Sequence, residues 1–145
     1  MKIVVINGPN INMLGIREPD IYGHTSYAQL CRMLQDHAAA QGIELDIYQS
    51  NHEGDLIDRI QAAYGEADGI VINPGAYTHT SIALPDAVKA VGLPAVEVHI
   101  SDPDTREDYR KIDYIREACV KTIAGRGVKG YIDAIQFLVE KESEQ

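Results

Sequence analysis

Three short runs of β-branched, apolar residues each end abruptly in a cluster of polar and turn-forming residues. The runs cover residues 3–6, 70–72 and 95–100, and the clusters after them contain asparagine, proline, glycine, serine or aspartate. Short apolar runs that alternate with helical patterns are typical of buried parallel strands. Because ligands bind beyond the carboxyl ends of such strands, the three clusters predict one site built from segments far apart in the sequence.

Strand and helix patterns alternate along the whole chain. Strands are expected at residues 2–6, 43–49, 69–72, 95–100 and 120–124, and helices at 26–41, 56–64, 81–91 and 131–139. This order predicts an α/β fold, a parallel sheet with helices on both faces. A five-stranded, flavodoxin-like sheet fits the 145 residues best. We therefore expect one domain over residues 1–145, with a frayed tail at about residues 140–145.

The connection from residue 7 to residue 24 interrupts this regular alternation. It shows neither helical nor strand periodicity and contains three glycines and two prolines. Strand-to-helix loops usually take about 2–6 residues, and loops beyond about 12–15 residues are usually functional or disordered. We therefore expect a mobile lid at about residues 10–24.

Composition and charge exclude several classes of partner. The formal net charge of −9 argues against nucleic acid, whose phosphates the protein would repel. The chain enters its first predicted strand without a secretion signal, and no apolar run approaches membrane length. Cys31 and Cys119 lack a CxxC spacing and are expected to be reduced, buried thiols. We expect a cytoplasmic protein with neither a nucleic-acid nor a membrane partner.

Glu97 and His99 lie two residues apart on one predicted strand, so their side chains share a face of the sheet. A buried carboxylate or imidazole is normally hydrogen-bonded, because leaving it without a partner is costly. Two interpretations are therefore open: a structural pair, or a general acid or base whose tautomer the carboxylate fixes. The position of the pair at the end of a strand favours the second interpretation.

The polar stretch that follows the run at residues 70–72 also has two interpretations. Asn73, followed by proline and glycine, is typical of a tight turn. His79 and the hydroxyls beside it lie at a predicted helix N-terminus, which suits an anion or a polyhydroxylated ring. Ser101, beside the next strand end, offers a hydroxyl in the same way.

A tyrosine and three arginines complete the set of candidate residues. Tyr22, beside a glycine, is either a surface turn residue or a base, and a phenol with a pKa of about 10 is a poor base unless a cation stabilises the phenolate. Arg17 lies in the same loop and offers that charge. Arg106 and Arg110 are four residues apart on a possible helical turn, and they are either solvated or the positive charge for an anionic ligand.

Motifs for other chemistries are missing from the sequence. It contains no G-x-S-x-G, Walker A, G-x-G-x-x-G or H-E-x-x-H stretch, and its five histidines show no metal-ligand spacing. We therefore expect an acid–base enzyme without metal or cofactor. The open alternative is a non-catalytic flavodoxin-like module that binds a small molecule, such as a flavin carrier or a phospho-receiver. Asparagines stand where a receiver needs acidic residues, which argues against that version.

Five segments together resemble type II 3-dehydroquinate dehydratase. They occur in the family's order within a similarity that covers about residues 3–138, at residues 7–10, 17–23, 49–54, 73–80 and 97–101. The resemblance implies a flavodoxin-like hydro-lyase that converts 3-dehydroquinate into 3-dehydroshikimate and water through an enolate. It places this reaction in the shikimate pathway of aromatic amino acid biosynthesis and implies neither metal nor coenzyme. It also implies a homododecamer built from trimers.

The resemblance further implies a role for each candidate residue. Tyr22, as the phenolate, would accept the substrate proton, and Arg17 would lower the pKa of the phenol and hold the lid closed. Asn10 would help to position a water that stabilises the enolate. His99, oriented by Glu97, would protonate the departing hydroxyl. The expected binding residues are Asn73, His79, Ile100, Ser101 and Arg110, with Asp86 lent by a neighbouring subunit and Arg106 as a lid-side support.

The chain departs from the family's usual residues at Asp102, Asp104 and Pro85. The two aspartates add negative charge near an expected anion site. We expect them to weaken substrate binding or to change subunit contacts, and to leave the catalytic roles intact.

Overall fold

Five parallel strands form one sheet in a computed structural model that describes residues 1–16 and 18–144. The sheet order is β2-β1-β3-β4-β5, and every neighbouring pair is parallel. The strands are β1 (Lys2–Asn7), β2 (Glu44–Gln49), β3 (Gly69–Asn73), β4 (Ala95–His99) and β5 (Lys121–Ala124). The chain moves from β1 to one side of the sheet first and to the other side afterwards. A topological switch point therefore lies between β1 and β3.

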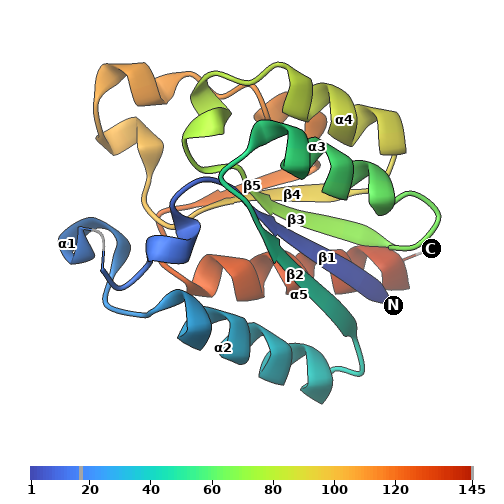
Figure 1. Ribbon diagram of the computed structural model, residues 1–145. Helices are drawn as coiled ribbons and strands as arrows, with labels where there is room; N and C mark the ends of the chain where they lie inside the picture. The colour runs from blue at the N-terminus through green and yellow to red at the C-terminus, as the bar shows by residue number, and fades with distance from the viewer. Residues whose placement is uncertain (17, 145) are drawn as a thin grey trace.

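Helices cover both faces of the sheet (Figure 1). One face packs against α2 (Tyr27–Ala40) and α5 (Lys129–Ser143), and the other against α3 (Glu53–Ala62) and α4 (Ala83–Val91). Side chains alternate along each strand, so Val5 and Val71 enter the first cluster while Ile6 and Ile72 enter the second. The predicted flavodoxin-like α/β fold is confirmed.

Local sequence signals set the limits of the helices. At the start of α2, Ser26 Oγ accepts from the Gln29 N–H at 3.1 Å, and Gln29 Oε1 accepts from the Ser26 N–H at 2.9 Å. This reciprocal capping box satisfies two backbone donors that the first turn leaves over. Helix α4 ends at Gly92, whose φ of 68° lies in the left-handed region that residues other than glycine rarely adopt. The elements therefore start and stop close to where the sequence predicts.

The loop expected to lack regular structure contains two short helical turns. These are η1 (Ile11–Met13) and α1 (Pro19–Tyr22), with Pro19 at the first position of α1. Proline is preset for that position, but single turns are too short to produce a periodic pattern. At the other terminus, α5 continues past the predicted limit at Val139, so the tail expected to fray is helical as far as Ser143.

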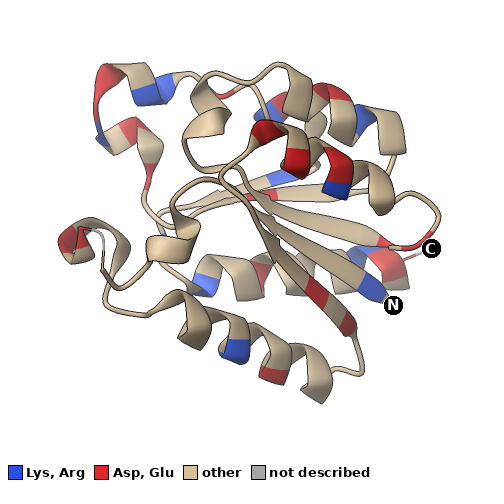
Figure 2. Ribbon diagram, viewed as in Figure 1, with Lys and Arg blue, Asp and Glu red and all other residues tan. Residues whose placement is uncertain are grey.

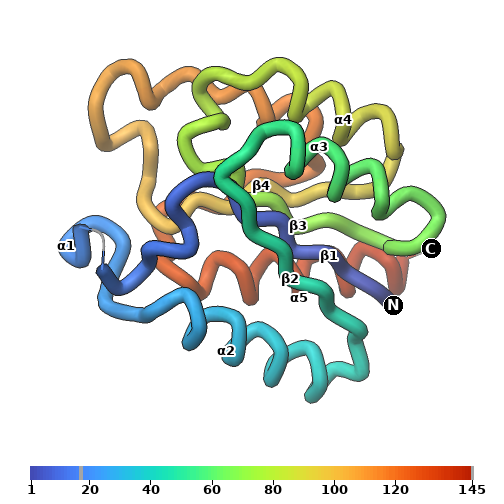
Figure 3. The backbone as a smooth tube through the Cα atoms, viewed as in Figure 1, coloured from blue at the N-terminus to red at the C-terminus, as the bar shows by residue number. Residues whose placement is uncertain are grey.

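The carboxyl ends of the three central strands lie side by side. Asn7 at the end of β1 is in register with Asn73 at the end of β3, and Ile72 is in register with Glu97 of β4. In Figure 3 the loops that follow β1 and β4 both extend from this end of the sheet. The three polar clusters of the sequence therefore meet at one edge.

Charged residues lie mainly on the helices and loops (Figure 2). Along the loop after β4, basic and acidic residues are interleaved. Inside the sheet, Glu97 is completely buried. Among residues 1–16 and 18–144, no helix is both long and apolar enough to cross a membrane.

Candidate active site

A pocket opens at the carboxyl edge of the sheet, between the loops that follow β1, β3 and β4. Most of the residues predicted for the site line it: Asn10, Tyr22, Asn73, His79, His99, Ile100, Ser101, Arg106 and Arg110. Glu97 lies behind His99 and contacts its ring. Asp86 is exposed on α4 and is not part of this lining. Arg17 lies outside the described residues.

The loops after β1 and β3 touch, and glycine makes the contact possible. A Cβ atom on Gly8 would lie 2.3 Å from the carbonyl oxygen of Pro74, and one on Gly75 would lie 2.9 Å from that of Pro9. The Gly8 N–H donates to the Asn73 carbonyl oxygen at 2.8 Å. The two loops therefore form one continuous wall of the pocket.

Asn73 is fixed by hydrogen bonds at both ends of its side-chain amide. Its Nδ2 donates to the Tyr131 hydroxyl at 2.8 Å, and that hydroxyl donates to Asn7 Oδ1 at 2.7 Å. Its Oδ1 accepts from the Gly75 N–H at 3.1 Å. Burial raises the pKa of Tyr131, so this phenol stays neutral and keeps its proton to donate. Asn73 therefore forms the predicted turn and also presents an amide of fixed orientation at the pocket.

Asn10 is held by the segment at residues 49–54, for which the sequence pattern indicated no role. Its backbone N–H donates to Asn51 Oδ1 at 3.1 Å, and its φ is 70°. Gln49 Nε2 donates to the Gly8 carbonyl oxygen at 3.1 Å, and the Tyr77 hydroxyl donates to the Asn51 carbonyl oxygen at 2.9 Å. The segment at residues 49–54 therefore supports the loop that carries Asn10.

His79 is a neutral acceptor at the pocket. Its Nδ1 lies 2.6 Å from the Ile112 carbonyl oxygen. Because a carbonyl oxygen only accepts, Nδ1 carries the proton and Nε2 is left as the acceptor. Burial lowers the pKa of His79, and the charges of Arg110 and Arg106 act in the same direction and outweigh the bond to Ile112. The ring is therefore neutral at pH 7.

Tyr22 is bound to an arginine from the loop after β4. Arg106 Nη1 donates to the Tyr22 hydroxyl at 2.6 Å, and its guanidinium carbon lies 5.3 Å from the ring centroid. The same Nη1 lies 3.4 Å from Ser101 Oγ. A guanidinium in this position stabilises the negative charge that forms on the phenol oxygen when its proton leaves. Arg106, expected only as a support of the lid, thus makes the kind of contact predicted for Arg17.

Arg110 adds a second positive charge to the lining. Its Nε donates to Glu107 Oε2 at 2.8 Å. Burial lowers the pKa of Arg110, but the bond to Glu107 and its charge outweigh burial and raise the pKa above its ordinary value. Two permanent cations therefore line a pocket in a protein of net charge −9.

The residues that depart from the family's usual pattern are not among those that line this pocket, although Asp102 stands between two lining residues, Ser101 and Pro103. The Asp102 carboxylate accepts from the Asp104 N–H at 3.0 Å and starts the short turn η3 (Pro103–Thr105). Pro85 is buried within α4. None of the three is part of the pocket lining. Their expected effects on binding and on subunit contacts stay predictions.

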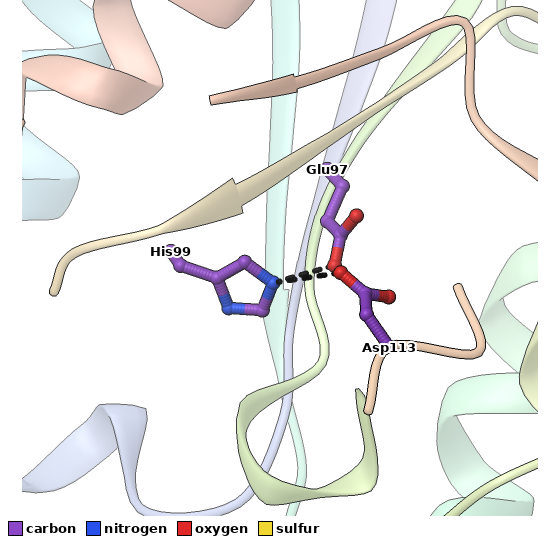
Figure 4. A group of neighbouring side chains, drawn as sticks. All are labelled: Glu97, His99 and Asp113. Carbon is purple, nitrogen blue, oxygen red and sulfur yellow. Dashed lines mark hydrogen bonds and ion pairs between the residues drawn. The ribbon is translucent and has the colours of Figure 1, made fainter. Parts of the chain in front are cut away.

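His99 is oriented by Glu97 (Figure 4). The ring Nε2 lies 2.5 Å from Glu97 Oε2, and Thr122 Oγ1 donates to Glu97 Oε1 at 2.9 Å. Burial raises the pKa of Glu97, but its hydrogen bonds, first of all the one from His99, outweigh burial and lower the pKa below its ordinary value. A carboxylate only accepts, so Nε2 carries a proton while Nδ1 points away from Glu97. The pair is thus structurally satisfied and also presents a nitrogen of defined protonation.

Asp113 lies beside this pair. Its Oδ2 lies 3.9 Å from His99 Nε2, and its Oδ1 accepts from the backbone N–H groups of Ile115 and Arg116 at 3.0 and 2.9 Å. Burial and the neighbouring Glu97 raise the pKa of Asp113 to about 7. Asp113 lies in a stretch without strand or long-helix periodicity, so no sequence signal pointed to it.

Glu97, His99 and Asp113 each offer one potential metal-ligand atom, and these atoms lie within 4.8 Å of one another. Two ligand atoms bound tetrahedrally to zinc at about 2.0–2.1 Å would be about 3.3 Å apart. Glu97 Oε2 and His99 Nε2 are closer, at 2.5 Å, because they are hydrogen-bonded to each other. These two side chains would therefore have to separate before both could hold one cation.

Comparison with known proteins gives consistent matches over nearly the whole chain. Residues 1–139 match the family described as Dehydroquinase class II. The 3-dehydroquinate dehydratase of Clostridium acetobutylicum is 54% identical over 138 residues, which cover 95% of this chain and 96% of that protein. The enzyme of the same name from Corynebacterium glutamicum is 54% identical over 137 residues, which cover 94% of each chain.

Solved structures agree with these sequence matches. The type II dehydroquinase from Butyrivibrio crossotus is 52% identical and superposes with a TM-score of 0.95 over 96% of this chain and 97% of that one. The type II dehydroquinase from Propionibacterium acnes is 37% identical and has a TM-score of 0.92, with 96% of each chain covered. Sequence and backbone thus give the same result.

Proposed function

Since this chain belongs to the class II dehydroquinase family, we propose that it is a hydro-lyase that removes water from 3-dehydroquinate to give 3-dehydroshikimate in the shikimate pathway. The observation that carries this proposal is that one pocket holds two proton-transfer side chains, one beside a positive charge and the other beside a negative charge. Tyr22 has a guanidinium on its oxygen, and His99 has a carboxylate on its ring. The guanidinium stabilises negative charge on the phenol oxygen, and the carboxylate stabilises positive charge on the imidazole.

Tyr22 is the proton acceptor in this mechanism. As the phenolate it removes a proton from the carbon next to the ketone, and the electron pair of that C–H bond moves into an enolate. Arg106 donates to the same oxygen at 2.6 Å and stabilises its charge before the transfer. Arg17, in the same loop, is proposed as a second cation that stabilises the transition state and holds the lid closed.

His99 is the proton donor. The enolate electrons form the new carbon–carbon double bond as the C–O bond breaks. The departing hydroxyl takes the Nδ1 proton of the protonated His99 ring and leaves as water, and the ring becomes neutral with its remaining proton on Nε2. Glu97 fixes the ring through the 2.5 Å contact with Nε2, so Nδ1 is the nitrogen proposed to face the departing hydroxyl. The carboxylate also stabilises the protonated ring before it gives up the proton.

Fixed polar groups hold the substrate between these two residues. Asn10 is proposed to position a water against the enolate oxygen, where a preorganised dipole acts most strongly. Arg110 supplies the charge for the substrate carboxylate, since a guanidinium matches a carboxylate fork. The ring hydroxyls and the carboxylate are proposed to contact Asn73, His79, Ile100 and Ser101.

Assembly and location follow the same proposal. We place Asp86 at the pocket of a neighbouring subunit within a homododecamer of trimers. Two facts support this: the carboxylate is exposed on α4, and Ile82 directly before that helix is a large apolar side chain that is 56% exposed. A cytoplasmic location is supported by Cys31 and Cys119, which are both free thiols.

The test is direct. Purified protein is mixed with 3-dehydroquinate, and the conjugated enone of the product is followed by its ultraviolet absorbance. We expect turnover without added metal or coenzyme. No product at a high enzyme concentration would contradict the proposal and leave the non-catalytic binding module as the alternative.

A further inference from the structure

Asp113 has one carboxyl oxygen that is buried and accepts no hydrogen bond from the described residues. This oxygen is Oδ2, and the side chain as a whole is only 7% exposed. Its other oxygen is fully engaged with the two backbone N–H groups at the start of η5 (Arg116–Ala118). A buried acceptor without a hydrogen-bond donor costs free energy. The groups around Oδ2 therefore decide whether this oxygen is an acceptor or carries a proton.

Of the titratable groups around Oδ2, the Glu97 carboxylate is its principal partner. Glu97 and His99 face it from β4, with one potential ligand atom of each within 4.8 Å. Arg116 Nη2 lies 3.4 Å away, but that side chain is 52% exposed and its charge is screened by solvent. Burial raises the pKa of the nearby Cys119 thiol to about 12, so it stays neutral. His79, on η2 (Gly75–His79), is also neutral at pH 7.

Two facing carboxyl groups are most stable when they share one proton. If Asp113 carries that proton, Oδ2 becomes a donor to Glu97, and the oxygen that lacked a hydrogen bond makes one. Burial is the largest cause of the raised pKa of Asp113, and the interaction with Glu97 raises it further. Burial opposes the lowering of the Glu97 pKa, and the bonds from His99 and then Asp113 outweigh it. Glu97 then stays ionised and continues to accept from His99 and Thr122.

We propose that Asp113 is a positioning residue for His99: while protonated it holds Glu97 in place as an anion, and when it ionises it adds a second negative charge that keeps the imidazole protonated. The inference rests on the proposed function, in which His99 is the proton donor. A donor must be protonated before each turnover. Asp113 therefore extends the pH range over which His99 can act, toward the alkaline side.

The sign of the effect follows from the charge. Near neutral pH Asp113 begins to lose its proton, and the resulting anion lies 3.9 Å from His99 Nε2. An opposite charge at this distance favours the charged form of the imidazole. Asp113→Asn keeps a donor toward Glu97 and an acceptor for the backbone but cannot ionise. The variant should therefore fold and position the ring, and lose only the second charge.

Two measurements test the proposal on wild type, Asp113→Asn and a matched control, Asp108→Asn. Asp108 lies in the same loop, with its side chain 98% exposed. The first measurement is kcat for 3-dehydroquinate against pH. The second is the rate at which diethyl pyrocarbonate, which attacks only neutral imidazole, modifies His99, followed by peptide mass spectrometry against pH. The second readout needs no turnover.

In Asp113→Asn we expect the alkaline limb of kcat and the inflection of His99 modification to move together to a pH lower by about one unit or more. At acidic pH kcat should match wild type, and Asp108→Asn should match wild type throughout. Unchanged profiles in Asp113→Asn would overturn the proposal. If that variant does not fold, Asp113→Ser, whose hydroxyl can also donate to Glu97 without charge, replaces it with the same expectation. Wild type that never turns over 3-dehydroquinate would instead contradict the proposed function and leave the modification test intact.

Discussion

The hydroxyl of Tyr22 accepts a hydrogen bond from Arg106 Nη1 at 2.6 Å, although 84 positions separate the two residues in the chain. Tyr22 belongs to the loop after β1, and Arg106 follows the turn η3 after β4. The contact ties these two loops together. The proposed base is thereby held by a cation from a segment outside its own loop.

This contact predicts the behaviour of Arg106→Gln. Without the guanidinium, the negative charge that forms on the Tyr22 oxygen during the reaction loses its stabilisation. We expect kcat to fall by about 10²-fold, which is the usual cost of losing one preorganised donor. Steady-state kinetics from pH 6 to pH 9 measure the loss. A kcat equal to wild type at every pH would show that Arg106 does not support the base.

The buried hydroxyl of Tyr131 gives a prediction about stability. Tyr131→Phe leaves Asn7 Oδ1 and Asn73 Nδ2 without their shared partner inside the core. We expect the free energy of unfolding to fall by about 1–3 kcal/mol, and KM to rise because Asn73 loses its fixed orientation. Urea denaturation and steady-state kinetics check the two parts. Tyr64→Phe is the control, since that side chain is 71% exposed, and a loss of equal size in the control would contradict the account.

The raised pKa of Asp113 predicts how stability changes with pH. In the folded protein this carboxyl keeps its proton up to about pH 7, whereas in the unfolded chain it ionises near pH 4. Between these values the unfolded chain has lost a proton that the folded protein retains, so the contribution of Asp113 to stability falls as the pH rises. Asp113→Asn lacks this loss. From pH 4 to pH 7 the Tm of the variant should therefore rise relative to that of wild type. A difference in Tm between the two proteins that stays constant over this window would refute the raised pKa of Asp113.

Much of the fold follows from patterns that are local in sequence. The apolar runs at β1, β3 and β4, the capping box at Ser26 and the stop at Gly92 are each contained within a few residues. Parallel pairing then brings their carboxyl ends to one edge without further information. The single turns η1 and α1 were not predicted, because three or four residues produce no periodic signal.

The site was predictable where a side chain follows a strand end, and not where it depends on contacts between distant segments. Asn73 and His99 belong to the first kind. Tyr131 was predicted only as the first residue of a helix, and Asp113 lies in an irregular loop, so their contacts with Asn73 and His99 appear only in three dimensions. The link between Arg106 and Tyr22 is of the same kind.

The central claim is that Tyr22 removes the proton while His99 supplies one, and Tyr22→Phe tests it most directly. The variant removes only the ionisable oxygen, so thermal unfolding and the Kd for 3-dehydroquinate should stay close to those of wild type. On the same preparation, we expect kcat to fall by about 10²–10⁴-fold, the range that general base catalysis contributes. A variant that binds substrate and retains a near-native kcat would contradict the account.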